Sequence, residues 1–97
     1  MRIIAKRVLR EFWEIHNDAE MPLRTWFHDA ERSRWMNTQH IKAVYRNASF
    51  VGDNRVVFNI CGNKYRLIVK FEFKYGVGYV RFIGTHKQYD RIDARTV

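Results

Sequence analysis

The segment RVVFNICGNKYRLIVKFEF, residues 55–73, decides the fold predicted for this chain. Apolar and polar residues alternate on both sides of Gly62-Asn63, as is typical of two strands joined by a short turn. The register that sets apolar side chains opposite one another contains three pairs: Val56 with Val69, Phe58 with Leu67, and Ile60 with Tyr65. Because one face of this hairpin is then apolar, the segment predicts an antiparallel sheet with one buried face.

A third run of alternating residues, YVRFIGT at 79–85, predicts a further strand of the same sheet. A four-residue turn at 75–78 would pair Lys74 with Tyr79 and Phe71 with Phe82. Continued inward, this register places Arg66 opposite Lys87 and one residue from His86. The predicted sheet therefore leads directly to the segment that follows it, THKQYD.

The first half of the chain has helical periodicity. Two groups of apolar residues recur at spacings of three and four: Ala5, Val8, Leu9, Phe12 and Ile15, then Leu23, Trp26, Phe27 and Ala30 after Pro22. Residues 40–50 are expected to form a short turn of helix before an edge strand, and Trp13, Trp26 and Trp35 are expected in the core. The prediction is an α+β fold in a single domain, residues 1–97. An N-terminal helical hairpin packs on one face of a small twisted antiparallel sheet, and a short C-terminal helix follows the sheet.

Composition limits the functional classes. The 97 residues are 46% apolar and carry a net charge of +8, which indicates a folded basic domain and favours a polyanionic partner such as nucleic acid. The single cysteine, Cys61, cannot form an internal disulfide, and the beginning of the chain has no uninterrupted apolar signal region. Both features favour a cytoplasmic protein, and no membrane span is expected because basic residues interrupt every apolar stretch.

Strand alternation predicts a mainly basic or amide-bearing face directed away from the predicted helices. Its residues would be Arg55, Asn59, Arg66, Lys70, Glu72 and Arg81. RNA-binding sheets usually present aromatic side chains for base stacking, and this face lacks them. The pattern therefore favours phosphate binding, with Arg55, Lys70 and Arg81 as the expected RNA contacts.

The segment THKQYD, residues 85–90, matches a capping box in which Thr85 and Gln88 cap the start of a helix. In that helix His86, Tyr89 and Asp90 are related by spacings of three and four, so they share one side. Lys87 adds positive charge beside them, and the free N–H groups of a helix start favour a phosphate.

This group of residues is suited to RNA cleavage by attack of a 2′-hydroxyl on the adjacent phosphate. His86 can transfer protons near neutral pH, and Arg66 can bind two phosphate oxygens. Lys87 or the Tyr89 hydroxyl can stabilise charge or protonate the leaving oxygen, while Asp90 would orient Arg66 or His86. No metal or other cofactor is expected, because the remaining histidines have no Cys or carboxylate partners at ligand spacing.

Two motifs carry a resemblance to a known family: F-N-x-x-G-N-x-Y-R-L-I at 58–68 and G-T-H-K-x-Y-D at 84–90. They resemble the HigB toxins within the RelE-like ribosome-dependent mRNA interferases. The resemblance implies a toxin that enters the ribosomal A site, cleaves mRNA and is neutralised by a helix-turn-helix antitoxin. The toxin–antitoxin complex would also bind operator DNA. By position, the implied site residues are Arg66, His86, Lys87, Tyr89 and Asp90.

A non-catalytic RNA-binding or ribosome-binding module is the alternative function. For single residues, too, plainer interpretations remain: Arg66 pairs with Glu72 or Asp90, His86 is an exposed helix start, and Tyr89 packs on the sheet edge. Part of the positive charge would also suit an acidic antitoxin segment, which is compatible with either function.

Overall fold

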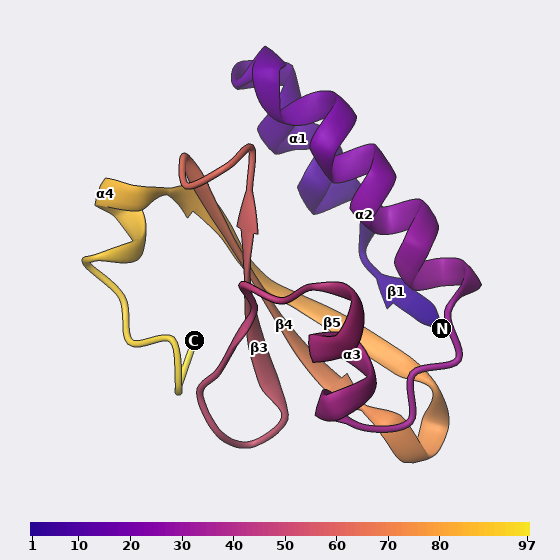
Figure 1. The fold of residues 1–97 in the computed structure, drawn as a ribbon. Coiled ribbons are helices and arrows are strands. Elements are labelled where there is room, and N and C mark those ends of the chain that lie inside the picture. Colours follow the sequence, from indigo (N-terminus) through magenta and orange to yellow (C-terminus); the bar gives the residue numbers. More distant parts are fainter.

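The computed structural model describes residues 1–97 and contains one five-stranded sheet with the long helices on one face (Figure 1). The strands are β1 (Arg2–Ile4), β2 (Ser49–Phe50), β3 (Arg55–Ile60), β4 (Tyr65–Glu72) and β5 (Val77–Thr85), in the order β1-β5-β4-β3-β2. The α+β class is confirmed. The sheet is mixed, however, because β1 runs parallel to β5 while the other pairs are antiparallel.

The helices are α1 (Lys6–Ile15), α2 (Glu20–Arg32), α3 (Thr38–Val44) and α4 (His86–Tyr89), with 3-10 turns η1 (Asn17–Ala19) and η2 (Phe73–Tyr75). The predicted helical hairpin, the short helix before an edge strand and the C-terminal helix are all confirmed. Ala5, which was expected within the first helix, is extended because the preceding residues join the sheet. None of the helices has both the length and the apolar character that a membrane span requires.

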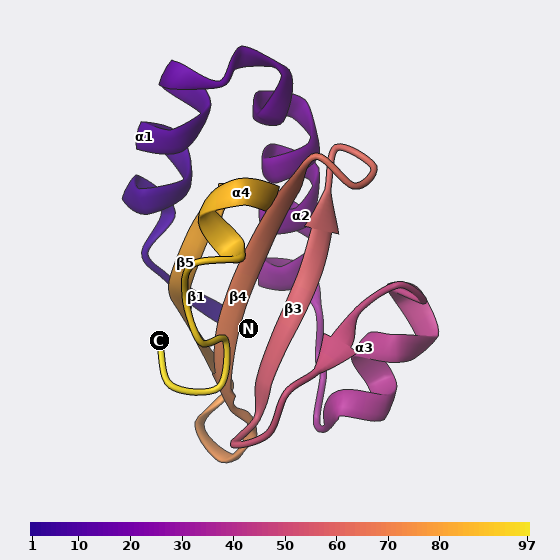
Figure 2. The same cartoon turned by 90° about the vertical axis from the view of Figure 1, so that its left-hand side faces the viewer.

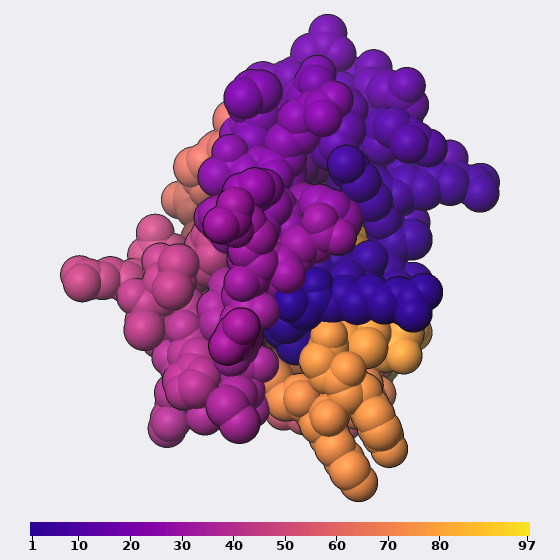
Figure 3. Space-filling view, turned by 90° about the vertical axis from the view of Figure 1, so that its right-hand side faces the viewer, coloured from indigo at the N-terminus to yellow at the C-terminus, as the bar shows by residue number.

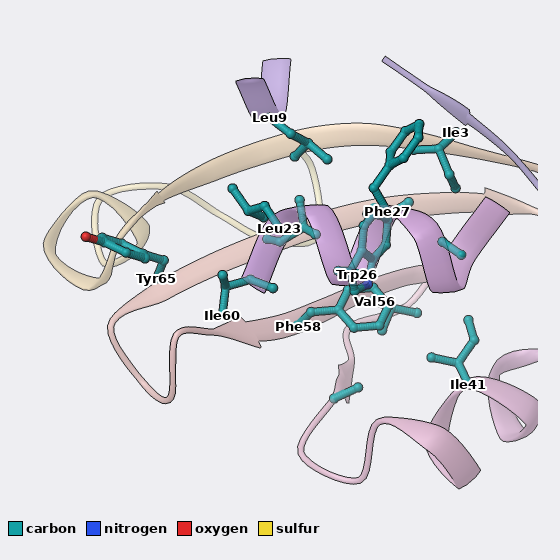
Figure 4. Close-up of a cluster of buried hydrophobic side chains, with 14 of the residues drawn as sticks. Ile3, Leu9, Leu23, Trp26, Phe27, Ile41, Val56, Phe58, Ile60 and Tyr65 are labelled. Atoms are coloured by element: carbon teal, nitrogen blue, oxygen red, sulfur yellow. The ribbon is translucent and has the colours of Figure 1, made fainter. Parts of the chain in front are cut away.

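The core lies between the sheet and the helical layer. All three tryptophans are buried there, as predicted. The rings of Trp26 and Phe58 of β3 pack edge to face, with their centres 5.2 Å apart (Figure 4). Seen from outside, residues of β1, α1 and α2 form a continuous layer over this side (Figure 3). Ile15 is 79% exposed, so the buried stripe of α1 is carried by Leu9 and Trp13.

The predicted β3–β4 register is confirmed at all three apolar pairs. The predicted β4–β5 register is wrong: Phe71 pairs with Gly78, and Val69 pairs with Val80. The cause is the turn, in which η2 is followed by Gly76 in the left-handed region at φ 65°, so that β5 begins at Val77. A bulge between the Ile68 and Val69 pairings then shifts the register by one residue.

The outer face of the sheet, meaning the face away from α1 and α2, is not bare. The chain after α4 folds back across it (Figure 2). Val57 and Ile68 point to this face by alternation with the core residues, yet they are only 4% and 0% exposed. The predicted open, polar face is therefore partly an apolar strip that residues beyond α4 cover.

Candidate active site

The start of α4 is held by the predicted capping box. The Thr85 hydroxyl accepts a hydrogen bond from the Gln88 N–H at 3.2 Å, and the Gln88 side-chain oxygen accepts from the Thr85 N–H at 2.8 Å. Within the helix, His86 Nδ1 lies 3.4 Å from a carboxylate oxygen of Asp90, and both side chains are exposed. The cap therefore fixes the helix start, and Asp90 can orient the imidazole.

Arg66 lies on β4 next to this helix, as expected, although Gly84 stands opposite it in place of Lys87. Its Nη1 donates to the carbonyls of Asn63 at 2.8 Å and Tyr65 at 3.3 Å, and no carboxylate pairs with it. The guanidinium carbon lies 5.9 Å from the centre of the Tyr89 ring. Neutral acceptors and a ring thus position Arg66, which leaves Nε and Nη2 free to bind an anion.

Tyr89 is half-buried between the sheet and the solvent. Its ring centre lies 6.4 Å from that of Phe82, so the expected packing of the ring against the sheet is present. Lys87, on the same helix, is exposed and forms no ion pair. The structure therefore brings Arg66 and Tyr89 into contact, and the helix that carries Tyr89 also carries the His86–Asp90 pair and the unpaired Lys87.

The three other basic residues expected on the outer face have internal partners. Arg55 was expected to be exposed, but it is buried at 8% exposure; its Nη1 donates to Asp53 at 2.9 Å and its Nε to the Val97 carbonyl at 3.1 Å. Arg81 Nε also donates to the Val97 carbonyl, at 3.3 Å, and Lys70 Nζ lies 3.2 Å from a carboxylate oxygen of Asp53. Hydrogen bonds from Lys70 and then Arg55 hold the pKa of Asp53 below its ordinary value. These three cations therefore stabilise the loop between β2 and β3, which contains Asp53, and the chain after α4.

The sequence also matches a model of a known protein family. The model described as HigB_toxin, RelE-like toxic component of a toxin-antitoxin system, matches residues 19–92. The chain belongs to this family. No curated protein matches the sequence. The HigB assignment indicated by the two motifs is therefore confirmed, and the chain is a toxin of a toxin–antitoxin system with an antitoxin as partner.

Gly84 is a residue of this HigB-family toxin whose role the sequence motifs did not reveal. A Cβ atom at Gly84 would lie 2.5 Å from the Phe82 ring and 2.8 Å from the side-chain oxygen of Gln88. A side chain at this position would displace the Phe82 ring or the Gln88 side chain of the capping box, so the absence of a side chain at Gly84 supports the start of α4. Its place directly before the cap, in G-T-H-K, was the available signal.

No group of three or more His, Cys, Asp or Glu side chains is arranged to hold a metal ion. A further cluster of ionisable residues lies at the β3–β4 turn, where Asp18 accepts hydrogen bonds from Lys64 and from the Tyr65 hydroxyl. These bonds, that from Lys64 first, hold the pKa of Asp18 below its ordinary value, and the hydrogen bond to Asp18 raises the pKa of Lys64. Because Asp18 joins the α1–α2 connection to the sheet, this cluster is structural.

Proposed function

We propose that this HigB-family toxin is a ribosome-dependent mRNA endoribonuclease that cleaves by attack of a 2′-hydroxyl on the adjacent phosphate. The observation that carries the proposal is the position of Arg66. Its guanidinium has no carboxylate partner and lies against the ring of Tyr89, which is on the same short helix as the paired His86 and Asp90. A phosphate bound there would meet a cation, a hydroxyl and an imidazole together.

The proposed chemistry follows from these groups. With Asp90 facing His86 Nδ1, the imidazole presents Nε2 to the substrate, where it exchanges a proton with the 2′-hydroxyl or the leaving 5′-oxygen. Arg66 binds the non-bridging oxygens, on which negative charge accumulates in the transition state. Lys87 or Tyr89 stabilises that charge or completes the second proton transfer. The P–O5′ bond breaks as the P–O2′ bond forms, which yields a 2′,3′-cyclic phosphate and a 5′-hydroxyl.

The partners proposed for this reaction are mRNA in the ribosomal A site and, in the inhibited state, a helix-turn-helix antitoxin whose complex with the toxin binds operator DNA. The net charge of +8 supports a ribonucleoprotein target, because basic proteins gain affinity from releasing counterions of RNA. A ribosome also explains how so small a site, with few groups for base recognition, would be supplied with a correctly positioned phosphate.

The non-catalytic RNA-binding alternative is less well supported. It requires an extended sheet surface, and here the chain after α4 crosses that surface and binds Arg55 and Arg81. Among the basic residues predicted for this surface, Arg66 alone has neither a carboxylate nor Val97 as a partner, and it lies next to α4, which carries the unpaired Lys87. This arrangement suits a single phosphate better than a long stretch of RNA.

The test is mapping of mRNA 5′ ends on programmed ribosomes with the parent protein and with Arg66→Ala, His86→Ala and Tyr89→Phe. Each substitution should slow cleavage by about 10² to 10⁴-fold, with unfolding free energies within about 0.5 kcal/mol of the parent. Thr85→Ala is the control: loss of the cap should cost about 1 kcal/mol and reduce cleavage less. If both His86→Ala and Tyr89→Phe cleave at the parent rate, the residues of α4 have no catalytic role and form only a capped helix. A parent protein that binds programmed ribosomes without cutting would favour the alternative.

A further inference from the structure

Half of β3 has no neighbour on its outer edge. β2 pairs with β3 only at Ser49 with Val57 and Phe50 with Val56. The same register would set Asn47 opposite Asn59, but a turn diverts the chain there, closed by the Ala48 N–H donating to the Tyr45 carbonyl at 3.1 Å. Figure 2 shows that no strand lies beside the upper half of β3 on the edge away from β4. The sheet thus ends in an edge that is only partly covered.

The backbone polar groups of Asn59 point to this open edge. At the other end of β3, the Arg55 N–H donates to the Gly52 carbonyl and the Arg55 carbonyl accepts from Val51, so Arg55 directs its backbone away from β4. Successive residues of a strand alternate between its two neighbours, so Asn59, four residues on, points the same way. None of the hydrogen bonds outside the helices and strands involves Asn59. One donor and one acceptor are therefore available to an added strand.

The open edge is bordered by two hollows that share Tyr45 and Asn59. The larger, of about 450 Å³, lies between β3 and α2, and the smaller, of about 280 Å³, lies beside the Tyr45–Ala48 turn. Met21 lines the larger hollow and is 68% exposed, while Val44 lines the smaller and is 62% exposed. Alternate side chains of a strand laid along β3 would enter the larger hollow, where apolar surface would be buried.

We propose that the open edge of β3 binds an extended, acidic segment of the antitoxin as an additional strand. The unpaired N–H and C=O of Asn59 can form hydrogen bonds with the backbone of an added strand. The hollow beside them can hold an apolar side chain of that strand. The charge calls for acidic residues: the toxin carries +8, and Arg46, which lines the smaller hollow, is exposed and forms no ion pair. The inference rests on the antitoxin partner that the family implies and is independent of the proposed cleavage.

The test compares Asn59→Pro with Asn59→Ala against the full-length antitoxin expressed from the toxin's own operon. Proline removes the N–H that points out of the sheet and leaves the β4 ladder intact, whereas alanine keeps the N–H. Calorimetry should show antitoxin binding at least about tenfold weaker for the proline variant and near the parent value for alanine. In the parent complex, NMR should show slowed exchange of the Asn59 amide.

Equal affinity of Asn59→Pro and parent, or unchanged exchange of the Asn59 amide in the complex, would overturn the proposal. A free toxin that dimerises through this edge, with Asn59→Pro making it monomeric while antitoxin binding is retained, would assign the edge to a second copy and also overturn it. If the proline variant does not fold, the exchange measurement on the parent complex alone decides. Ribosomal cleavage by free toxin is measured separately, so failure of the proposed nuclease activity leaves this result interpretable.

Discussion

Replacement of Arg55 by alanine should destabilise the fold without removing a substrate contact. Arg55 is 8% exposed, and its Nε donates to the Val97 carbonyl at 3.1 Å. A shielded hydrogen bond from a charged donor contributes about 1.5–3 kcal/mol, whereas the contact with Asp53 adds little because that carboxylate is 68% exposed. We therefore expect a loss of about 2 kcal/mol, which lowers the unfolding temperature of a domain this size by roughly 8–16 °C.

The measurement is thermal and urea unfolding of the parent, Arg55→Ala and the matched variant Arg66→Ala, together with cleavage per folded molecule. Arg66→Ala should leave the unfolding free energy within about 0.5 kcal/mol of the parent and slow cleavage by about 10² to 10⁴-fold. Arg55→Ala should do the reverse, with cleavage per folded molecule close to the parent. The reasoning is refuted if Arg55→Ala unfolds at the parent temperature but loses ribosome affinity or cleavage, since Arg55 would then contact RNA as the sequence alone predicted.

Three further outcomes are expected. Gly84→Ala sets a methyl group 2.5 Å from the Phe82 ring, so it should lose about 1–3 kcal/mol of stability and most cleavage; unchanged unfolding and cleavage would contradict the close packing of α4. Hydrogen bonds from Lys64 and the Tyr65 hydroxyl lower the pKa of Asp18 below 3.8. Its contribution to stability is therefore complete above about pH 4 and lost as pH falls through the folded-state pKa. Unfolding curves of parent and Asp18→Asn should converge below pH 4, and a constant difference would argue against this linkage. Ribosome binding should weaken steeply with salt; binding unchanged between 50 and about 300 mM salt would indicate an apolar interface.

The β3–β4 hairpin was predictable because two independent local signals agree, the turn residues at Gly62-Asn63 and the alternation on either side. The β4–β5 register was not, because Phe73 continues the alternation of β4 and yet begins the 3-10 turn. The bulge near Arg81 likewise depends on packing between strands and not on sequence period. β1 is three residues long and pairs in parallel with residues more than seventy positions away, which no local pattern indicates.

The candidate site, like the fold, could be predicted from the sequence only in part. The capping box and the His86–Asp90 pair depend on spacings within six residues, so their geometry followed from the sequence. The accessibility of Arg55 did not, because its hydrogen-bond acceptors belong to Asp53 in a tight turn and to Val97 beyond α4. Alternation determines which face of a sheet a side chain occupies. It does not determine which later segment covers that face.

The basic residues of the outer face differ in the acceptors that the protein supplies for their charges, and this difference affects which of them can bind a phosphate. Arg55 and Lys70 share the carboxylate of Asp53, and Arg55 and Arg81 share the Val97 carbonyl, so the protein itself supplies acceptors for their charges. Arg66 has only the neutral carbonyls of the β3–β4 turn region and the Tyr89 ring. An internal carboxylate at Arg66 would compete with every incoming phosphate and would lower the local positive potential. A cation that neutral groups position and no carboxylate pairs with is suited to stabilise charge that appears only in the transition state, because little reorganisation is needed when the charge develops.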